Sequence, residues 1–270
     1  MAKISICVEP VFGNLDYKSR IEKIASIGYT YYDLWFHNKA FDGANITDEM
    51  KDFDMLAELN EKHGLITNSF VFCHPDGGIE ASLINKKDRQ LAVDSLGEII
   101  PLAKKVGCKF LVSGSGNVDS SISNEEAVES MIETLKAQAP ECEKEGIVIL
   151  LEPWNTKVDH PDCFLDDPQL GVDVVKAVAS PSVKLLYDIY HMQIMAGNQT
   201  EFIKENLEHI AAFQIAGVPG RHEPFNNELD YPFIIREVQK AGFDGTFGLE
   251  YWPTMDHEES LKKSLELLDV

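Results

Sequence analysis

The sequence predicts a single (β/α)8 barrel of the TIM type over residues 1–270. Short, nearly continuous apolar segments alternate with amphipathic segments of helical period, as in parallel strands covered by helices. The alternation repeats eight times in 270 residues, more often than an open doubly wound sheet usually requires. No low-complexity linker or abrupt change in composition divides the chain, which favours one catalytic domain.

The first unit shows the features on which each assignment depends. Residues 3–8 (KISICV) are rich in β-branched residues, and segment 17–28 places Ile21, Ile24 and Ile27 on one helical face before a glycine. Further strands are predicted at 29–36, 65–72, 108–116, 146–153, 182–189, 209–217 and 245–252. Further helices are predicted at 48–64, from about 86 to the KKVGC segment at 104–108, and at 124–146, 168–179, 199–207, 230–241 and 257–269.

Charge and composition argue against several classes of function. Forty-five acidic and 24 basic residues give a formal net charge of −21, which repels phosphate backbones and anionic membrane surfaces. No segment has the ~18 uninterrupted apolar residues of a membrane span, and MAKISICVEP lacks a secretory pattern. The five cysteines are widely spaced without a C-x-x-C pair, so we expect reduced thiols. These features predict a cytoplasmic protein with no nucleic-acid or membrane partner.

Side chains with oxygen donors occur at the ends of four consecutive predicted strands. Glu152 ends the fifth strand, Asp188 the sixth, Gln214 lies in the seventh and Glu250 in the eighth. Active sites of this fold lie at the carboxyl ends of the strands, where these side chains would meet. Three carboxylates gathered there repel one another unless a cation neutralises them. An all-oxygen set favours a hard divalent cation, Mn²⁺ or Mg²⁺, over zinc.

Simpler roles for the same residues stay open. Each acid could separately cap a helix or pair with a lysine. For an isolated Asp-x-x-His such as Asp188 and His191, helix capping is the commoner role. The case for a shared site rests on the recurrence of acids at neighbouring strand ends.

Four segments in the second half of the chain carry a family resemblance. They are LLEPWNTK (150–157), YDIYHMQIM (187–195), QIAGVPGRHEP (214–224) with ELDYP (228–232), and GFDGTFGLEY (242–251). Together they resemble the hydroxypyruvate isomerase group of the xylose-isomerase-like superfamily of barrel sugar isomerases and epimerases. The resemblance covers the whole chain and is densest from 147 to 253.

The resemblance implies a metal bound by Glu152, Asp188, Gln214 and Glu250. It implies that Glu152 and Glu250 face each other across the substrate and move protons. It also implies that His191 and Arg221 contact substrate oxygens.

Arg221 lies in the loop that follows a ligand-bearing strand. Its guanidinium is suited to orient substrate oxygens and neighbouring carboxylates. Lys157 lies where the group tends to carry a basic residue, although an exposed loop lysine is an equal alternative. Trp252, like Trp35 and Trp154, lies near a strand end, where an aromatic face suits the C–H surface of a sugar. Core filling explains each tryptophan equally well.

Several positions depart from the pattern of the group. An acidic residue is expected in place of Gly217 and a lysine in place of Trp252, and the second strand ends with Asp33 and His37 where a glutamate is usual. Losing a positive charge near the metal argues against a small carboxylate substrate.

The predicted function is a divalent-metal-dependent isomerase or epimerase of a small ketose or 2-keto acid. Proton abstraction next to a carbonyl needs a positioned base and an electrophile for the oxyanion, and a metal chelating a cis-enediolate would supply the second. Return of the proton to the same carbon gives epimerisation, and return to the neighbouring carbon gives isomerisation. One alternative is a metal-dependent lyase, of the dehydratase or C-glycoside-cleaving type, on the same barrel. Another is a non-catalytic metal- or sugar-binding protein, and a homo-oligomer remains open.

Overall fold

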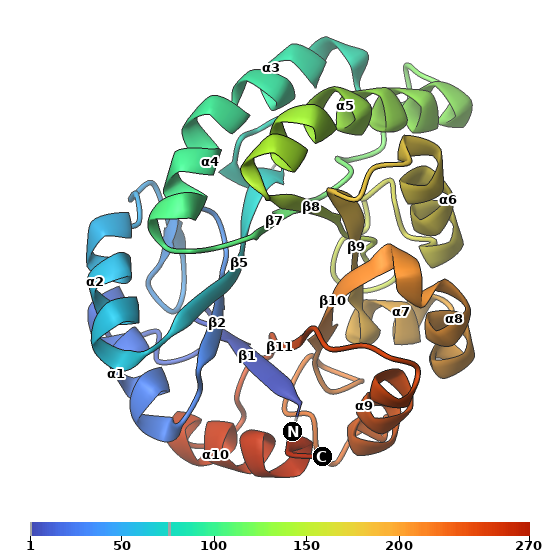
Figure 1. Ribbon diagram of the computed structural model, residues 1–270. Coiled ribbons are helices and arrows are strands. Elements are labelled where there is room, and N and C mark those ends of the chain that lie inside the picture. Colours follow the sequence, from blue (N-terminus) through green and yellow to red (C-terminus); the bar gives the residue numbers. More distant parts are fainter. Residues whose placement is uncertain (1, 75–76) are drawn as a thin grey trace.

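Eight parallel strands form a closed barrel in the computed structural model, which describes residues 2–74 and 77–270. They are β1 (Lys3–Cys7), β2 (Tyr31–Leu34), β5 (Ile66–His74), β7 (Phe110–Ser113), β8 (Val148–Leu151), β9 (Val183–Asp188), β10 (Ile210–Ile215) and β11 (Thr246–Leu249). Each strand pairs in parallel with the next, and β11 pairs with β1, so that Thr246 lies opposite Lys3. The predicted (β/α)8 barrel is thereby confirmed (Figure 1).

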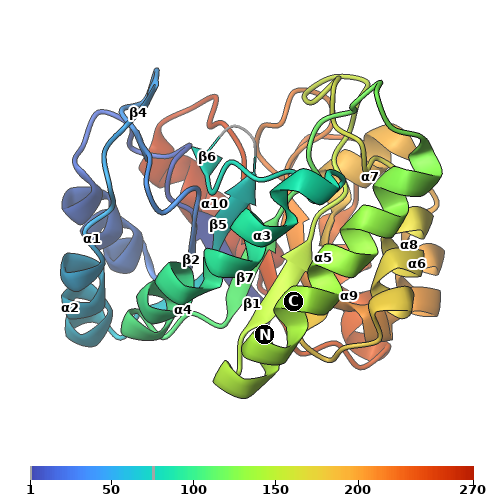
Figure 2. The same ribbon diagram turned by 90° about the horizontal axis from the view of Figure 1, so that it is seen from above.

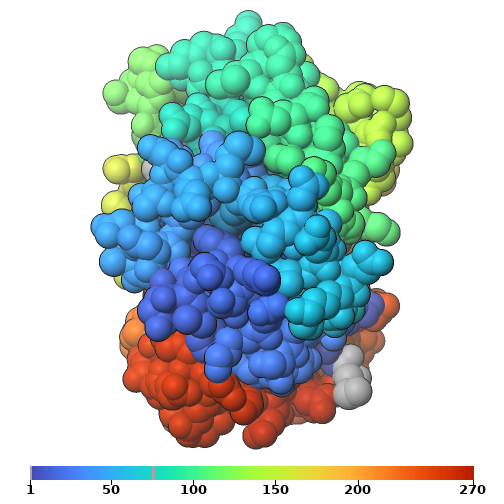
Figure 3. All heavy atoms as spheres, turned by 90° about the vertical axis from the view of Figure 1, so that its left-hand side faces the viewer, coloured from blue at the N-terminus to red at the C-terminus, as the bar shows by residue number. Residues whose placement is uncertain are grey.

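Helices surround the barrel on its outer side (Figure 1). They are α1 (Tyr17–Ile27), α2 (Phe53–His63), α3 (Arg89–Asp94), α4 (Leu96–Lys105), α5 (Asn124–Glu145), α6 (Pro168–Val178), α7 (Ile189–Met195), α8 (Gln199–Asn206), α9 (Tyr231–Lys240) and α10 (His257–Leu268). The first and last helices contact each other, and Figure 3 shows the blue N-terminal and red C-terminal segments side by side on the outer surface. Among the described residues, none of the helices has the length and apolar character needed to span a bilayer.

Local side-chain chemistry explains where helices differ from the prediction. α2 begins at Phe53 rather than at residue 48, because the Asp52 carboxylate accepts the backbone N–H groups of Asp54 and Met55. The helix predicted from about residue 86 is divided into α3 and α4 at Ser95. α7 is absent from the prediction and follows β9 directly.

The loop between β2 and α2 forms an extension of the barrel, which we call the 35–52 segment. It contains the antiparallel pair β3 (Ala40–Phe41) and β4 (Ile46–Thr47), and β4 projects at the top in Figure 2. A Cβ on Gly13 would lie 2.4 Å from the Cα of Gly43, so the loop after β1 packs directly against the turn of this pair. A second short strand, β6 (Gly77–Gly78), pairs antiparallel with the end of β5.

Buried charges attach the 35–52 segment to the barrel. Lys51 Nζ lies 3.0 Å from Glu9 Oε1, and the two side chains are only 2% and 1% exposed. The buried Arg20 guanidinium donates to the backbone oxygens of Gly13 and Phe41, at 2.9 and 2.7 Å. These contacts hold the 35–52 segment against the barrel; without them it would be an exposed surface loop.

Alternation of side chains along the strands determines what faces the barrel interior. On β8, Ile149 and Leu151 belong to the main core, whereas Leu150 belongs to a separate small cluster with Val112, Leu186 and Ala212. Because successive side chains point to opposite faces, Glu152 lies on the same face as Leu150. The same two-residue step places Asp188 and Gln214 on that face, since they follow Leu186 and Ala212.

Candidate active site

A cavity of about 210 Å³ lies at the carboxyl ends of the barrel strands. Five residues of the predicted site line it, namely Glu152, Gln214, Arg221, Glu250 and Trp252. The volume is below the ~300–1,000 Å³ of sites for drug-sized ligands, so the cavity suits a small substrate.

Asp188 uses its two carboxylate oxygens differently. Oδ1 accepts the backbone N–H groups of Tyr190 at 2.7 Å and His191 at 3.3 Å, and thereby caps α7. Oδ2 lies 3.4 Å from His191 Nε2. Asp188 is therefore a helix cap, as the simpler interpretation of Asp-x-x-His holds, and it also presents one oxygen to its neighbours in the site.

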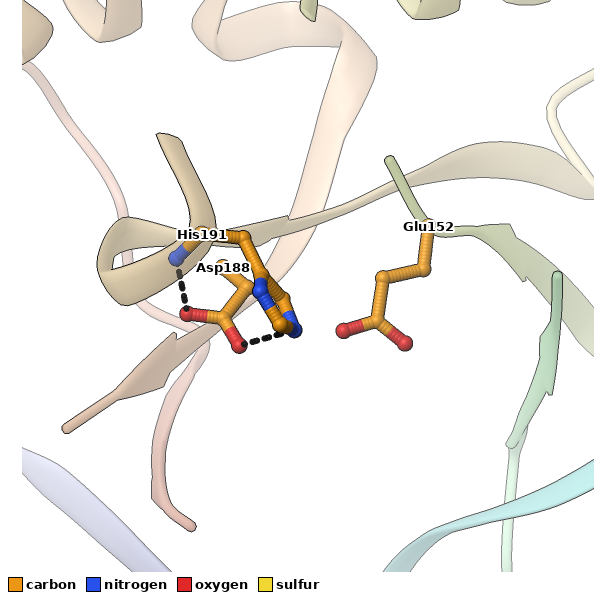
Figure 4. Close-up of side chains that lie close together, drawn as sticks. All are labelled: Glu152, Asp188 and His191. Carbon is orange, nitrogen blue, oxygen red and sulfur yellow. Dashed lines mark hydrogen bonds and ion pairs between the residues drawn. The ribbon is translucent and has the colours of Figure 1, made fainter. Parts of the chain in front are cut away.

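Glu152, Asp188 and His191 form a buried cluster. Each offers one nitrogen or oxygen atom, and these atoms lie within 4.8 Å of one another. Figure 4 shows the imidazole of His191 between the two carboxylates. Burial raises the pKa of Glu152 well above its usual range, and the charges of Asp188 and Glu250 raise it further. Burial also raises the pKa of Asp188, so the carboxylates cannot all ionise without compensating positive charge.

Gln214 adds a neutral oxygen next to this cluster. It pairs in register with Asp188 across β10 and β9. Its Oε1 is buried and has no hydrogen-bond partner in the described part of the chain. An unpaired buried oxygen is costly, so a cation would satisfy both this atom and the excess of carboxylates. These donors therefore fit the predicted divalent ion.

The Glu250 carboxylate is held away from the buried cluster. Its Oε2 lies 2.7 Å from Arg221 Nη2, and its Oε1 accepts a hydrogen bond from the indole of Trp35. The structure thus brings Glu152 and Asp188 together, while Glu250 lies in the same cavity with both oxygens engaged. To bind an ion with the others, Glu250 would have to release one of these partners.

The remaining predicted site residues lie in different surroundings. Arg221 stacks over the ring of Tyr190 at 5.4 Å from the ring centre. Trp252 is 36% exposed, and its ring meets those of Trp35 and Phe41 at centroid distances of 6.0 and 5.6 Å. Trp35 and Trp252 line the cavity, and together with Phe41, which packs against both, they form an aromatic wall on one side of it.

Lys157 does not line the cavity. Its exposed ammonium donates to the backbone oxygens of Ile194 and Met195, at 3.0 and 3.3 Å, and so caps the end of α7. Its contact with the substrate stays a prediction.

Gly217 has a packing reason to be glycine. A Cβ at this position would lie 2.4 Å from the backbone oxygen of Glu223. The backbone N–H of Gly217 also donates to His222 at 2.7 Å. The departure at Gly217 therefore has a local cause in the backbone packing of this loop.

Several residues at the site are missing from the prediction, among them His74 and His160, which line the cavity, and Asn155 and Asp159. Asn155 is fully buried and contacts His191, and Asp159 contacts both Asn155 and Tyr190. In the sequence, the position of Asn155 three residues after Glu152 is the only feature that separates it from an ordinary loop asparagine.

Comparison with known proteins gives a consistent picture. The family model described as xylose isomerase-like TIM barrel matches residues 21–269. The Homo sapiens protein named "Putative hydroxypyruvate isomerase" is 35% identical over 173 residues, and the match covers 62% of each chain, less than two thirds of that relative. Hydroxypyruvate isomerase of Escherichia coli (strain K12) is 27% identical over 97% of this chain and 98% of its own. A crystal structure described as AP endonuclease, family 2, from Brucella melitensis superposes with a TM-score of 0.86, at 27% identity over 97% of both chains.

Proposed function

Because the chain belongs to the xylose isomerase-like TIM barrel family, we propose that it is a divalent-metal-dependent isomerase or epimerase of a small ketose or 2-keto acid. The observation that carries this proposal is the pair of carboxylates, Glu152 and Glu250, in one small cavity at the strand ends. Similarity to proteins named hydroxypyruvate isomerase supports the reaction and the substrate class.

Glu152, Asp188, Gln214 and Glu250 are the proposed ligands of Mn²⁺ or Mg²⁺. The unpaired oxygen of Gln214 and the raised pKa of Glu152 support this assignment. A bound ion would neutralise the carboxylates and polarise the carbonyl oxygen of the substrate.

Proton transfer is the role of the two glutamates. One takes the proton from the carbon next to the substrate carbonyl, and either glutamate returns it to the resulting enediolate. Arg221 and Trp35 orient the Glu250 carboxylate for this step. Arg221 and His191 contribute donors to substrate oxygens, and the aromatic wall excludes water from one side of the cavity.

A similar structure is described as an AP endonuclease, which makes phosphodiester hydrolysis the competing proposal. A net charge of −21 opposes the approach of a nucleic acid, and a cavity of about 210 Å³ is small for an extruded nucleotide with its flanking backbone. A lyase would use the same residues but would release a leaving group instead of forming an isomer.

Solvent-deuterium incorporation tests the reaction. The enzyme, loaded with Mn²⁺ or Mg²⁺, is incubated in deuterated water with a panel of ketoses and hydroxypyruvate, and substrates are analysed by NMR after the ion is removed. We expect deuterium at the carbon next to the carbonyl in at least one substrate, together with an isomer or epimer. Loss of a hydroxyl or glycosidic group would assign a lyase, and absence of exchange throughout would contradict the proposal.

Metal analysis tests the ligands separately. Asp188→Asn is expected to lose the bound ion, while Asp173→Asn, on the exposed face of α6, keeps it. Stoichiometric ion in Asp188→Asn would remove Asp188 from the ligand set.

A further inference from the structure

The side chain of Asn155 has a hydrogen-bond partner for each of its polar groups. Its Oδ1 accepts the backbone N–H groups of Val158 and Asp159, both at 3.0 Å. Its Nδ2 lies 2.6 Å from Asp159 Oδ2 and 2.6 Å from His191 Nδ1. Asn155 is 0% exposed, so water does not compete for these partners.

These partners fix the orientation of the amide. If oxygen and nitrogen were exchanged, the NH₂ group would face the two backbone N–H groups, and the oxygen would face the carboxylate of Asp159. Both arrangements are repulsive, so the group next to His191 is the NH₂ donor.

The orientation of the amide in turn fixes the protonation of His191. Because the amide of Asn155 donates, Nδ1 of His191 must accept, and it cannot carry a proton. The neutral imidazole then carries its single proton on Nε2. An imidazolium would place an N–H group against the NH₂ group of Asn155.

We propose that Asn155 is a positioning residue that keeps His191 in the Nε2–H tautomer, which excludes His191 from the metal ligands and makes it a hydrogen-bond donor to a substrate oxygen. Nε2 lies within the cluster of Glu152 and Asp188, where its proximity alone would make it a candidate ligand (Figure 4). It is buried and makes no hydrogen bond among the residues that the structure describes, and 3.4 Å separates it from Asp188 Oδ2.

The tautomer determines which ions the site favours. A nitrogen that carries a proton has no lone pair for a metal, so the ligands are the oxygens of the proposed set. Oxygen donors favour Mn²⁺ and Mg²⁺, whereas an additional imidazole nitrogen favours Zn²⁺. This second half of the proposal rests on the proposed metal-dependent function, whereas the tautomer itself does not.

Two substitutions together should invert the tautomer of His191 with little change in side-chain shape. Asn155→Asp replaces the amide donor by an acceptor, which favours a proton on Nδ1 of His191 and a free lone pair on Nε2. Combined with Asp159→Asn, it avoids two adjacent carboxylates, because the new amide can donate to the new carboxylate and to the hydroxyl of Tyr190. Asp159→Asn alone is the matched control, since it leaves the donor of Asn155 in place.

Nitrogen NMR of the imidazole in metal-free protein is the first measurement. The His191 signals are assigned by their loss in His191→Gln. In the wild type and in Asp159→Asn we expect Nε2 of His191 to be protonated and Nδ1 to be unprotonated. In the double variant we expect the reverse. A wild-type His191 protonated on Nδ1, or a double variant with an unchanged tautomer, would overturn the proposal.

Competition between Zn²⁺ and Mn²⁺ is the second measurement. We expect the affinity ratio to shift toward Zn²⁺ by roughly 10–100-fold in the double variant, the usual effect of changing the partner of a liganding histidine. The ratio should stay near the wild-type value in Asp159→Asn. An inverted tautomer without a change in this ratio would overturn the claim that the tautomer is what excludes His191 from the ligands. If the wild type binds neither ion, the proposed function and the metal half of this proposal both fail, and NMR alone decides the tautomer.

Discussion

The buried ion pair between Lys51 and Glu9 provides a test of how the cavity wall is held. The perturbation is Lys51→Met, which keeps the length of the side chain and removes the ammonium. Glu9 would then keep the Tyr17 hydroxyl at 3.1 Å and the Cys7 thiol at 3.4 Å as its side-chain partners. The change leaves a buried carboxylate without its cation.

The expected loss follows from the geometry of the pair. Two charges 3.0 Å apart attract by about 5.5 kcal/mol at an effective dielectric constant of ~20. Desolvation offsets much of this attraction when both charges are present, but removal of one partner typically costs about 3–5 kcal/mol. We expect Lys51→Met to lower the free energy of unfolding by that amount. The double variant with Glu9→Gln should lose less, since no charge is left unpaired, whereas the backbone oxygens of Phe36 and Lys39 lose the Lys51 donor in both variants.

Urea denaturation measures both variants, with Lys39→Met as the control. Lys39 pairs with the exposed Asp48, so its loss should cost no more than ~1 kcal/mol. Because the 35–52 segment carries Trp35, which holds Glu250, we also expect Lys51→Met to lower kcat/KM on the identified substrate. The reasoning is wrong if Lys51→Met stays within ~1 kcal/mol of the wild type, or if the double variant is as unstable as the single one.

Three further predictions concern catalysis, specificity and pH. Glu152→Gln and Glu250→Gln should each lower activity by roughly 10²–10⁴-fold while the ion is largely retained. One of the two variants should still exchange a substrate proton with deuterated water. Near-normal turnover in both variants would refute the proton-transfer roles. Because Trp252 stands where the group is expected to carry a lysine, turnover of a four- to six-carbon ketose should exceed that of hydroxypyruvate. Parallel kcat/KM measurements test this, and a preference for hydroxypyruvate would contradict it. Burial and the charge of Lys51 lower the pKa of His37 to about 4, so stability should fall as the pH drops from about 6.5 to 4, by up to ~1.4 kcal/mol per pH unit. Denaturation of His37→Gln at several pH values should show a shallower slope in that window, and an unchanged slope would exclude this residue as the cause.

The barrel could be predicted from the sequence because its signals are local. Apolar strands and a helical period recur within each unit, and glycines such as Gly28 end helices in the left-handed conformation, with φ at 116°. The convergence of Glu152 and Gln214 on one cavity follows from the same signals, because a closed barrel brings the strand ends together.

Side-chain geometry between distant residues could not be predicted in the same way. Glu250 is bound by Trp35, 215 positions earlier in the chain, and by Arg221, and no local pattern encodes the choice between these partners and an ion. Asn155 acts on His191 across 36 positions through the orientation of one amide. α7 is missing from the prediction because its first turn depends on the helix cap of Asp188, a role that stayed an open alternative beside the predicted one of metal ligand at a strand end.

The two oxygens of Asp188 allow its structural and chemical roles to be separated. Asparagine caps helices about as well as aspartate, so Asp188→Asn should keep the cap of α7 and remove a negative charge beside Glu152. Asp188→Ala removes both, and loss of a cap typically costs ~1 kcal/mol. In ion-free protein we therefore expect Asp188→Asn to be at least as stable as the wild type and Asp188→Ala to be less stable than Asp188→Asn. With saturating Mn²⁺ the order of wild type and Asp188→Asn should reverse, because only the wild type gains binding free energy from the ion. Thermal unfolding with and without the ion measures all three proteins, and an Asp188→Asn variant stabilised by Mn²⁺ as much as the wild type would show that Asp188 serves α7 alone.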